Sequence, residues 1–151
     1  MHDKEIQYFT EGLSFAKDEF YLDSINKFKI LIDEYPQSDL ADDAMYNVGL
    51  CYFKMKQIEQ AIETFNHVII NYPDATISVL DNGSEFGKTA AKCHYGIFQC
   101  FLLLGKEEEA KTELTKLTPF NQSTYILLEG KKVSFEELAK EILNNYLFKK
   151  N

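Results

Sequence analysis

Apolar residues recur at helical spacing along most of the chain, and the pattern is clearest between residues 44 and 69. A first stretch carries them at Ala44, Val48, Cys51, Tyr52 and Met55, and a second at Ile58, Ala61, Ile62, Phe65, Val68 and Ile69. The polar pair Lys56-Gln57 separates the two stretches, and Pro73 prevents the second from continuing as a helix. This spacing predicts two antiparallel helices joined by a short connection.

The chain repeats this hairpin. The phrase FKILIDEYP at residues 28–36 returns as FNHVIINYP at residues 65–73, which is 37 residues later. Five positions keep the intervals 3, 9, 4 and 8 in both copies, namely Gly12, Phe15, Ser24, Phe28 and Pro36, and then Gly49, Tyr52, Ala61, Phe65 and Pro73. A third copy, HYGIFQCFLLLGKEEEAKTELTKL, follows the second after 49 residues, with Phe98 in place of Gly49. Since one helical hairpin cannot bury its apolar faces alone, the copies must stack on one another.

This order of small, aromatic, small, aromatic and proline positions resembles the tetratricopeptide repeat over roughly residues 5–118. The resemblance implies an all-α fold, a right-handed α-α superhelix of about three helical hairpins. We expect a single domain over 1–151, with repeats at about 5–38, 39–74 and 88–118, an insertion at 75–87 and a C-terminal cap at 119–151. The stretch EYPQSDLADDAMYNVGLCYF is similar to the bacterial envelope branch of the family, which includes outer-membrane assembly lipoproteins and cell-division coordinators.

Two segments outside the repeats carry signals of their own. Ser134 and Glu137 form a capping box at the start of a helix, whose apolar stripe runs from Phe135 to Tyr146. Such a helix caps a solenoid, or it folds into the groove and regulates access. The stretch TYILLEGKKVS predicts a short β-hairpin, and the pair Asn82-Gly83 predicts a turn within a second hairpin in the insertion.

The resemblance also implies that the first helices of the repeats line a concave face. The residues implied to face it are Phe9, Leu13, Lys17, Tyr46, Leu50, Phe53, Lys54, Tyr95, Gln99 and Leu102. Aromatic side chains with few torsions to freeze suit peptide capture, although tyrosines at these positions also occur as packing between hairpins. A family subtype that clamps acidic C-terminal peptides uses Lys and Asn where this chain has Ile6, Phe9, Thr10 and Leu13, so a clamp of that kind is excluded.

Composition narrows the class of partner. The 151 residues carry a net charge of −8, and all sixteen basic residues are Lys, so an acidic surface without arginine argues against nucleic-acid binding. No window approaches eighteen consecutive apolar residues, which predicts no membrane span. The N-terminus MHDKEIQYFTEG lacks the basic and apolar regions of a signal peptide. We therefore expect a cytoplasmic protein, or a periplasmic one if a leader has been removed.

The sequence carries no recognisable chemistry. The three cysteines have no C-x-x-C pair, which indicates a reducing compartment, and His94 beside Cys93 would point away from it on a helix. The nucleotide-binding, serine-hydrolase and zinc-protease motifs are absent, so we expect no cofactor, no metal and no enzymatic activity.

The sequence thus predicts a non-enzymatic module that binds a protein or peptide through a concave aromatic groove, with an apolar segment of the partner against Tyr46, Phe53 and Tyr95. Two alternatives remain open: an acidic inhibitor or immunity protein that neutralises a basic toxin or nuclease, and a holding chaperone for an exported protein. The C-terminal helix favours a capped monomer.

Overall fold

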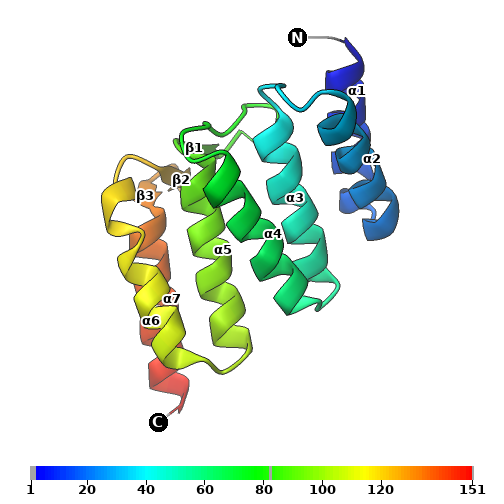
Figure 1. Ribbon diagram of the computed structural model, residues 1–151. Coiled ribbons are helices and arrows are strands. Elements are labelled where there is room, and N and C mark those ends of the chain that lie inside the picture. The colour runs from blue at the N-terminus through cyan, green and yellow to red at the C-terminus, as the bar shows by residue number, and fades with distance from the viewer. Residues whose placement is uncertain (1–2, 82, 151) are drawn as a thin grey trace.

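The structure is a computed structural model and describes residues 3–81 and 83–150. Consecutive helices pack side by side as antiparallel hairpins, and the hairpins follow one another in chain order along a single stack (Figure 1). The helices are α1 (Asp3–Lys17), α2 (Tyr21–Glu34), α3 (Ala41–Lys54), α4 (Ile58–Asn71), α5 (Thr89–Leu103), α6 (Glu107–Thr115) and α7 (Phe135–Lys150), with a short 3₁₀ turn η1 (Thr118–Phe120). The fold is the expected right-handed α-α superhelix. None of the described helices is both long enough and apolar enough to cross a bilayer.

The turn inside each hairpin has the same backbone conformation. Glu19, Lys56 and Gly105 occupy equivalent positions and have φ values of 65°, 66° and 72°. Lys56 lies in the polar break that the sequence indicates, where α3 ends at Lys54 and α4 begins at Ile58. A residue in the left-handed conformation ends a helix by turning the chain so that the following N–H groups bond the last carbonyl groups. Only the third hairpin uses the glycine that this conformation favours.

The second hairpin depends on close packing around Phe65, which is 1% exposed. A methyl group on Gly49 of α3 would lie 2.7 Å from Phe65 Cε1, and one on Gly96 of α5 would lie 2.8 Å from Phe65 Cε2. The ring thus occupies space that two glycines leave open, one within its own hairpin and one in the next. Gly12 and Phe28 repeat the first of these contacts at 2.6 Å.

The third hairpin exchanges the positions of the large and small residues. Phe98 of α5 stands where the second hairpin has Gly49, and it is fully buried in a core cluster with Ala110, Leu117 and Phe135. The opposite helix offers Leu114 instead of a phenylalanine, and Leu114 packs against the same cluster. The aromatic side chain is therefore supplied by the first helix of the pair, and it also contacts α7, which follows the repeats.

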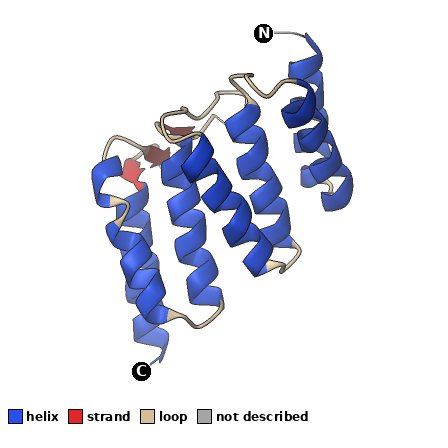
Figure 2. Cartoon of the chain, viewed as in Figure 1, coloured by secondary structure: helices blue, strands red, loops and turns tan. Residues whose placement is uncertain are grey.

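Three short strands form an antiparallel sheet along one edge of the helical stack, beside the starts of α5 and α7 (Figure 2). Strand β2 (Thr124–Ile126) pairs with β3 (Lys132–Ser134), which confirms the predicted C-terminal hairpin. The expectation for the insertion is wrong, because β1 (Glu85–Phe86) pairs with β2 and not within the insertion. Inside the insertion there is an isolated bridge between Thr76 and Lys88. Asn82 of the predicted turn lies outside the described residues.

The C-terminal helix α7 packs on the last hairpin. Its start has the predicted capping box, in which Ser134 N donates to Glu137 Oε1 and Glu137 N donates to Ser134 Oγ, both at 3.1 Å. Phe135 and Ala139 are buried in the cluster around Phe98. At the far end, Lys150 Nζ lies 2.7 Å from Glu107 Oε2 and ties α7 to the start of α6. The helix covers the end of the core.

We expect Gly49→Ala to lower the free energy of unfolding by about 1–3 kcal/mol, because the added methyl group overlaps the Phe65 ring. Phe65→Leu, which copies Leu114 of the third hairpin, removes the overlapping ring atoms. The double variant should therefore lose clearly less stability than the sum of the two single losses. Urea unfolding followed by circular dichroism measures all three, with Ser14→Ala on the exposed face of α1 as the control. Additive losses would contradict the contact.

Candidate functional site

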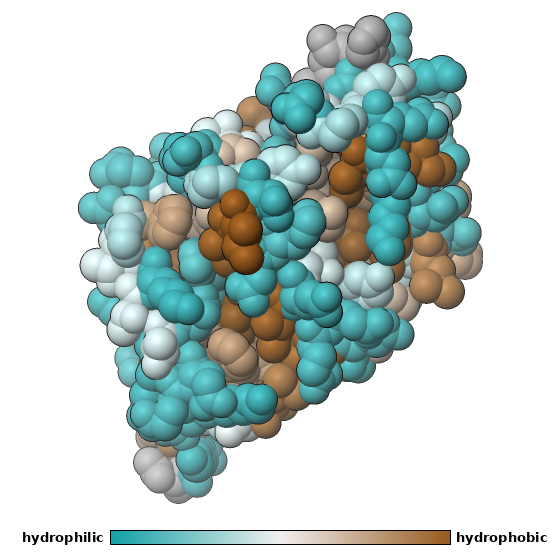
Figure 3. Space-filling model, viewed as in Figure 1, coloured by the Kyte–Doolittle hydropathy of each residue, from teal (hydrophilic) through white to brown (hydrophobic). Residues whose placement is uncertain are grey.

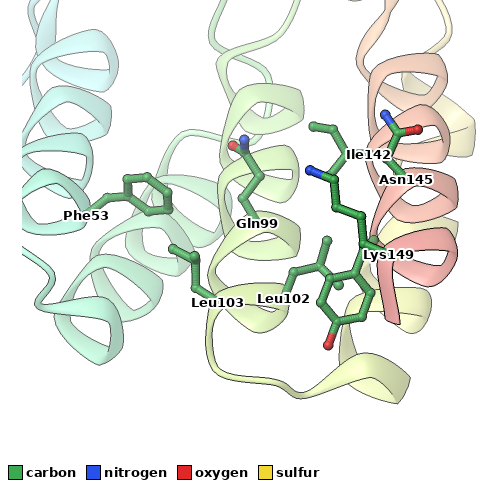
Figure 4. Close-up of a pocket in the computed structure, with 8 residues that line it drawn as sticks. Phe53, Gln99, Leu102, Leu103, Ile142, Asn145 and Lys149 are labelled. Carbon is green, nitrogen blue, oxygen red and sulfur yellow. The ribbon is translucent and has the colours of Figure 1, made fainter. Parts of the chain in front are cut away.

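A groove runs between the first helices of the last two hairpins and the C-terminal helix. Its volume is about 470 Å³, and it is lined mainly by apolar side chains. The lining residues are Phe53 from α3, Gln99, Leu102 and Leu103 from α5, and Ile142, Asn145, Tyr146 and Lys149 from α7. Phe53 points from α3 toward α5, while Lys149 extends from α7 toward the space beside α5 (Figure 4). We call this site the α3–α5–α7 groove.

Three of the residues predicted to face the concave side line this groove: Phe53, Gln99 and Leu102. Phe53 and Leu102 are half-buried, since each also packs against a core cluster. The α7 side of the groove is absent from the sequence prediction, which considered only the first helices of the repeats. Leu103, at 57% exposed, is the most accessible apolar residue of the lining and was missed as well.

Most of the aromatic residues that were predicted to face a partner pack against other side chains of the protein instead. Phe9 is fully buried, with its ring centroid 5.6 Å from that of Phe28, so it belongs to the core and is unavailable to a partner. Tyr46 packs against the core cluster around Phe65, with the two ring centroids 5.6 Å apart. Tyr95 packs in the same way against Phe135 of α7, again at 5.6 Å. Tyr46 thus packs on the second helix of its own hairpin, and Tyr95 packs on the C-terminal helix.

The remaining predicted residues lie outside the lining of the groove. Leu13 is partly buried against the first core cluster, and Leu50 is half-buried on α3. Lys17 and Lys54 are located at the ends of α1 and α3.

A sequence signal for the α7 wall does exist. Ile142, Asn145, Tyr146 and Lys149 follow one another at spacings of three, one and three, which places them on one face of a helix. Ile142 of this face also packs against the core cluster around Phe98. The groove face of α7 therefore borders the face that packs on the core.

The face formed by α2, α4 and α6 differs from the groove. Figure 3 shows that hydrophilic side chains predominate there and that apolar residues form separate patches. Ile70 of α4 is 74% exposed. Scattered exposed apolar side chains are ordinary on a folded protein, whereas a lined apolar groove indicates a binding site.

A second candidate site is a buried polar network under the insertion. The side chain of Lys92 is 1% exposed, and its ammonium group lies 2.7 Å from Asp81 Oδ2 and 2.9 Å from Glu85 Oε1. It also lies 3.9 Å from the centroid of the Tyr46 ring. Burial alone would lower the pKa of Lys92, but the Tyr46 ring and the two carboxylates raise it above its usual value. Lys92 therefore stays charged, and the insertion supplies its counter-ions.

The insertion is also bonded to the start of α3. Ser78 N donates to Asp43 Oδ1 at 3.0 Å, and Asn47 Nδ2 donates to Asp81 Oδ1 at 3.3 Å. Asp43 is fully buried, and its Oδ2 has no hydrogen-bond partner among the described residues. Burial, together with the neighbouring charges of Asp42 and Asp81, raises the pKa of Asp43 to about 8 despite the bond from Ser78 and the charge of Lys92. At neutral pH this carboxyl group holds its proton.

Displaced pKa values often mark active sites, but this cluster is closed to a substrate. Lys92 is enclosed by its partners, and among the described residues no group of three or more His, Cys, Asp or Glu side chains is arranged to hold a metal ion. Burial also raises the pKa of the three free cysteine thiols, to about 12 for Cys100, so they are poor nucleophiles. The network fixes the insertion and the sheet on the solenoid.

The titration of Asp43 gives a testable pH dependence. The unfolded chain releases this proton near pH 4 and the folded chain near pH 8. The contribution of protonated Asp43 to the free energy of unfolding is therefore complete below about pH 4, and it is lost as the pH rises from there through 8. Asp43→Asn keeps an oxygen for Ser78 N and cannot ionise. We expect its free energy of unfolding, relative to wild type, to rise by at least about 1 kcal/mol between pH 5 and pH 8.

Denaturant unfolding at several pH values measures this difference, and Asp33→Asn on the exposed face of α2 is the matched control. A difference that stays constant from pH 5 to pH 8 would show that Asp43 is already ionised in the folded protein.

Comparisons with known proteins agree with this architecture. A family model described as a tetratricopeptide repeat matches residues 43–75. A chloroplast protein of Arabidopsis thaliana is 29% identical over 59 residues, which are 39% of this chain. The match spans only 18% of the length of that relative.

Solved structures match over nearly the whole chain. The type III secretion chaperone SycD of Yersinia enterocolitica, solved with a peptide of the translocator YopD, is 14% identical, with a TM-score of 0.65 over 100% of this chain and 98% of that one. PcrH of Pseudomonas aeruginosa is 12% identical, with a TM-score of 0.68 over 97% and 94%. The Sgt2 tetratricopeptide-repeat domain of Aspergillus fumigatus is 14% identical, with a TM-score of 0.64 over 99% and 83%. The chain therefore contains a tetratricopeptide repeat at residues 43–75 and has, over its length, the fold of a tetratricopeptide-repeat solenoid.

Proposed function

We propose that this protein is a non-enzymatic interaction module that binds an apolar segment of a partner protein in the α3–α5–α7 groove. The observation that carries the proposal is the groove itself, an apolar channel of about 470 Å³ with walls from three helices. Apolar clefts with a few polar groups at defined places are the usual form of a binding site. The SycD structure, which has this fold, was solved with a peptide bound and gives the proposal further support.

The packing of the groove suits recognition by a preformed surface. Phe53 and Leu102 are anchored in core clusters, and α7 is held at one end by Phe135 and at the other by the ion pair of Lys150 with Glu107. A partner would therefore meet side chains that have already lost much of their freedom. Less conformational entropy is then lost on binding, which favours affinity.

We also propose that the protein acts as a monomer, because α7 covers the end of the core at Phe98 and Leu117. The similarity of EYPQSDLADDAMYNVGLCYF to bacterial envelope repeats leads to a finer proposal, that the partner belongs to an envelope or division assembly. The inhibitor and holding-chaperone alternatives have no observation of this structure in their favour. The inhibitor alternative would place the function on the acidic outer surface instead of the groove.

The test compares two exposed aliphatic residues on helices. Leu103 lies in the groove at 57% exposed, and Ile70 lies on α4 at 74% exposed. We expect Leu103→Glu to reduce the recovery of the partner from lysate of the source organism by about tenfold, because a charge is then buried against an apolar segment. Ile70→Glu should leave recovery unchanged.

Quantitative mass spectrometry of the captured proteins gives the readout, and circular dichroism checks that both variants fold. Partners lost from Ile70→Glu and retained by Leu103→Glu would overturn the proposal. Partners retained by both variants but released by salt would support the inhibitor alternative.

A further inference from the structure

The polar groups of the groove indicate what kind of segment it binds. Gln99 and Asn145 contribute the two side-chain amides of the lining, and Lys149 contributes its one ammonium group. Within the described part of the chain, none of these three side chains makes a hydrogen bond or an ion pair. Their donors and acceptors are therefore unused by the fold.

Neighbouring lysines on α7 behave differently. Lys150 lies 2.7 Å from Glu107, and Lys140 lies 3.7 Å from Glu136. Lys149 is the lysine whose side chain extends toward α5 and the groove (Figure 4). In a chain with a net charge of −8, this places a positive charge that pairs with no described residue beside an apolar surface. A carboxylate on the partner complements it.

The two amides indicate the conformation of the partner. A helix satisfies its own backbone N–H and C=O groups, whereas an extended segment needs bonding partners from outside. Each amide offers two N–H donors and one carbonyl acceptor, which match the backbone of an extended peptide. Gln99 lies on α5 and Asn145 on α7, so the amides come from both sides of the channel.

We propose that the α3–α5–α7 groove binds an extended apolar segment that carries one acidic side chain, with the carboxylate on Lys149 and the peptide backbone on Gln99 and Asn145. This inference rests on the proposed function. The inference assigns the carboxylate to an internal Asp or Glu, and a chain terminus at Lys149 of the α7 wall is the competing outcome of the test.

Selection from a library of random peptides, each amidated at its C-terminus, tests the charge preference. Wild type should enrich peptides in which an acidic residue lies next to apolar residues. Lys149→Glu should lose that preference and enrich basic residues instead. Lys140→Glu, on the same helix but outside the groove lining, should select the same peptides as wild type.

The affinity of the best selected peptide is then measured by fluorescence anisotropy in a double-mutant cycle between the peptide and Lys149. Replacing its acidic residue by the neutral amide should weaken binding to wild type by about three- to tenfold, and should have no effect on binding to Lys149→Gln. This change in affinity is the size expected for a charge-assisted contact at a site that remains open to water.

The outcomes separate this inference from the proposed function. The selected peptides could show no charge preference and yet fail to bind Leu103→Glu. That result would overturn the inference and leave the proposed function standing. If a matched library with free C-termini yields groove-binding peptides and the amidated library yields none, the inference is also overturned. Peptides whose binding is unchanged by Leu103→Glu would overturn the proposed function itself.

Discussion

Phe65 packs its ring between Gly49 of α3 and Gly96 of α5, and the spacing of the solenoid depends on this contact. The ring needs a glycine on each side, because a methyl group at either position would lie within 2.8 Å of its carbon atoms. One contact closes a hairpin, and the other sets the distance to the next hairpin. The groove lies between α3, α5 and α7, so the distance between its α3 and α5 walls follows from the same packing.

The pattern of small and aromatic positions made most of the fold predictable. The intervals in the first two hairpins fix which faces meet, and the break at Lys56-Gln57 fixes where one helix ends. The third hairpin was harder to interpret, because Phe98 and Leu114 exchange the large and small positions of the pair. The ring is still buried, but it now also packs on α7. A local periodicity cannot reveal which later helix completes such a core.

The insertion and the groove depend on contacts between segments far apart in the chain. A local sequence pattern does not predict such contacts. Lys92 is an ordinary-looking lysine in the sequence, and only the fold brings Asp81, Glu85 and the Tyr46 ring around it. In the groove, Phe53, Gln99 and Leu102 were predictable from the repeat. Helical spacing places Lys149 on one face of α7 with Ile142, but it does not place that face in the groove, because α7 lies outside the repeats and docks by tertiary packing.

The central claim is that the partner lies between α3, α5 and α7. Hydrogen–deuterium exchange of the free protein and of the protein bound to its captured partner tests this claim most directly. The account predicts slower exchange on binding in peptides from α5 and from the last half of α7, with α4 and α6 unchanged. Slower exchange confined to α2, α4 and α6, with α5 and α7 unchanged, would contradict it.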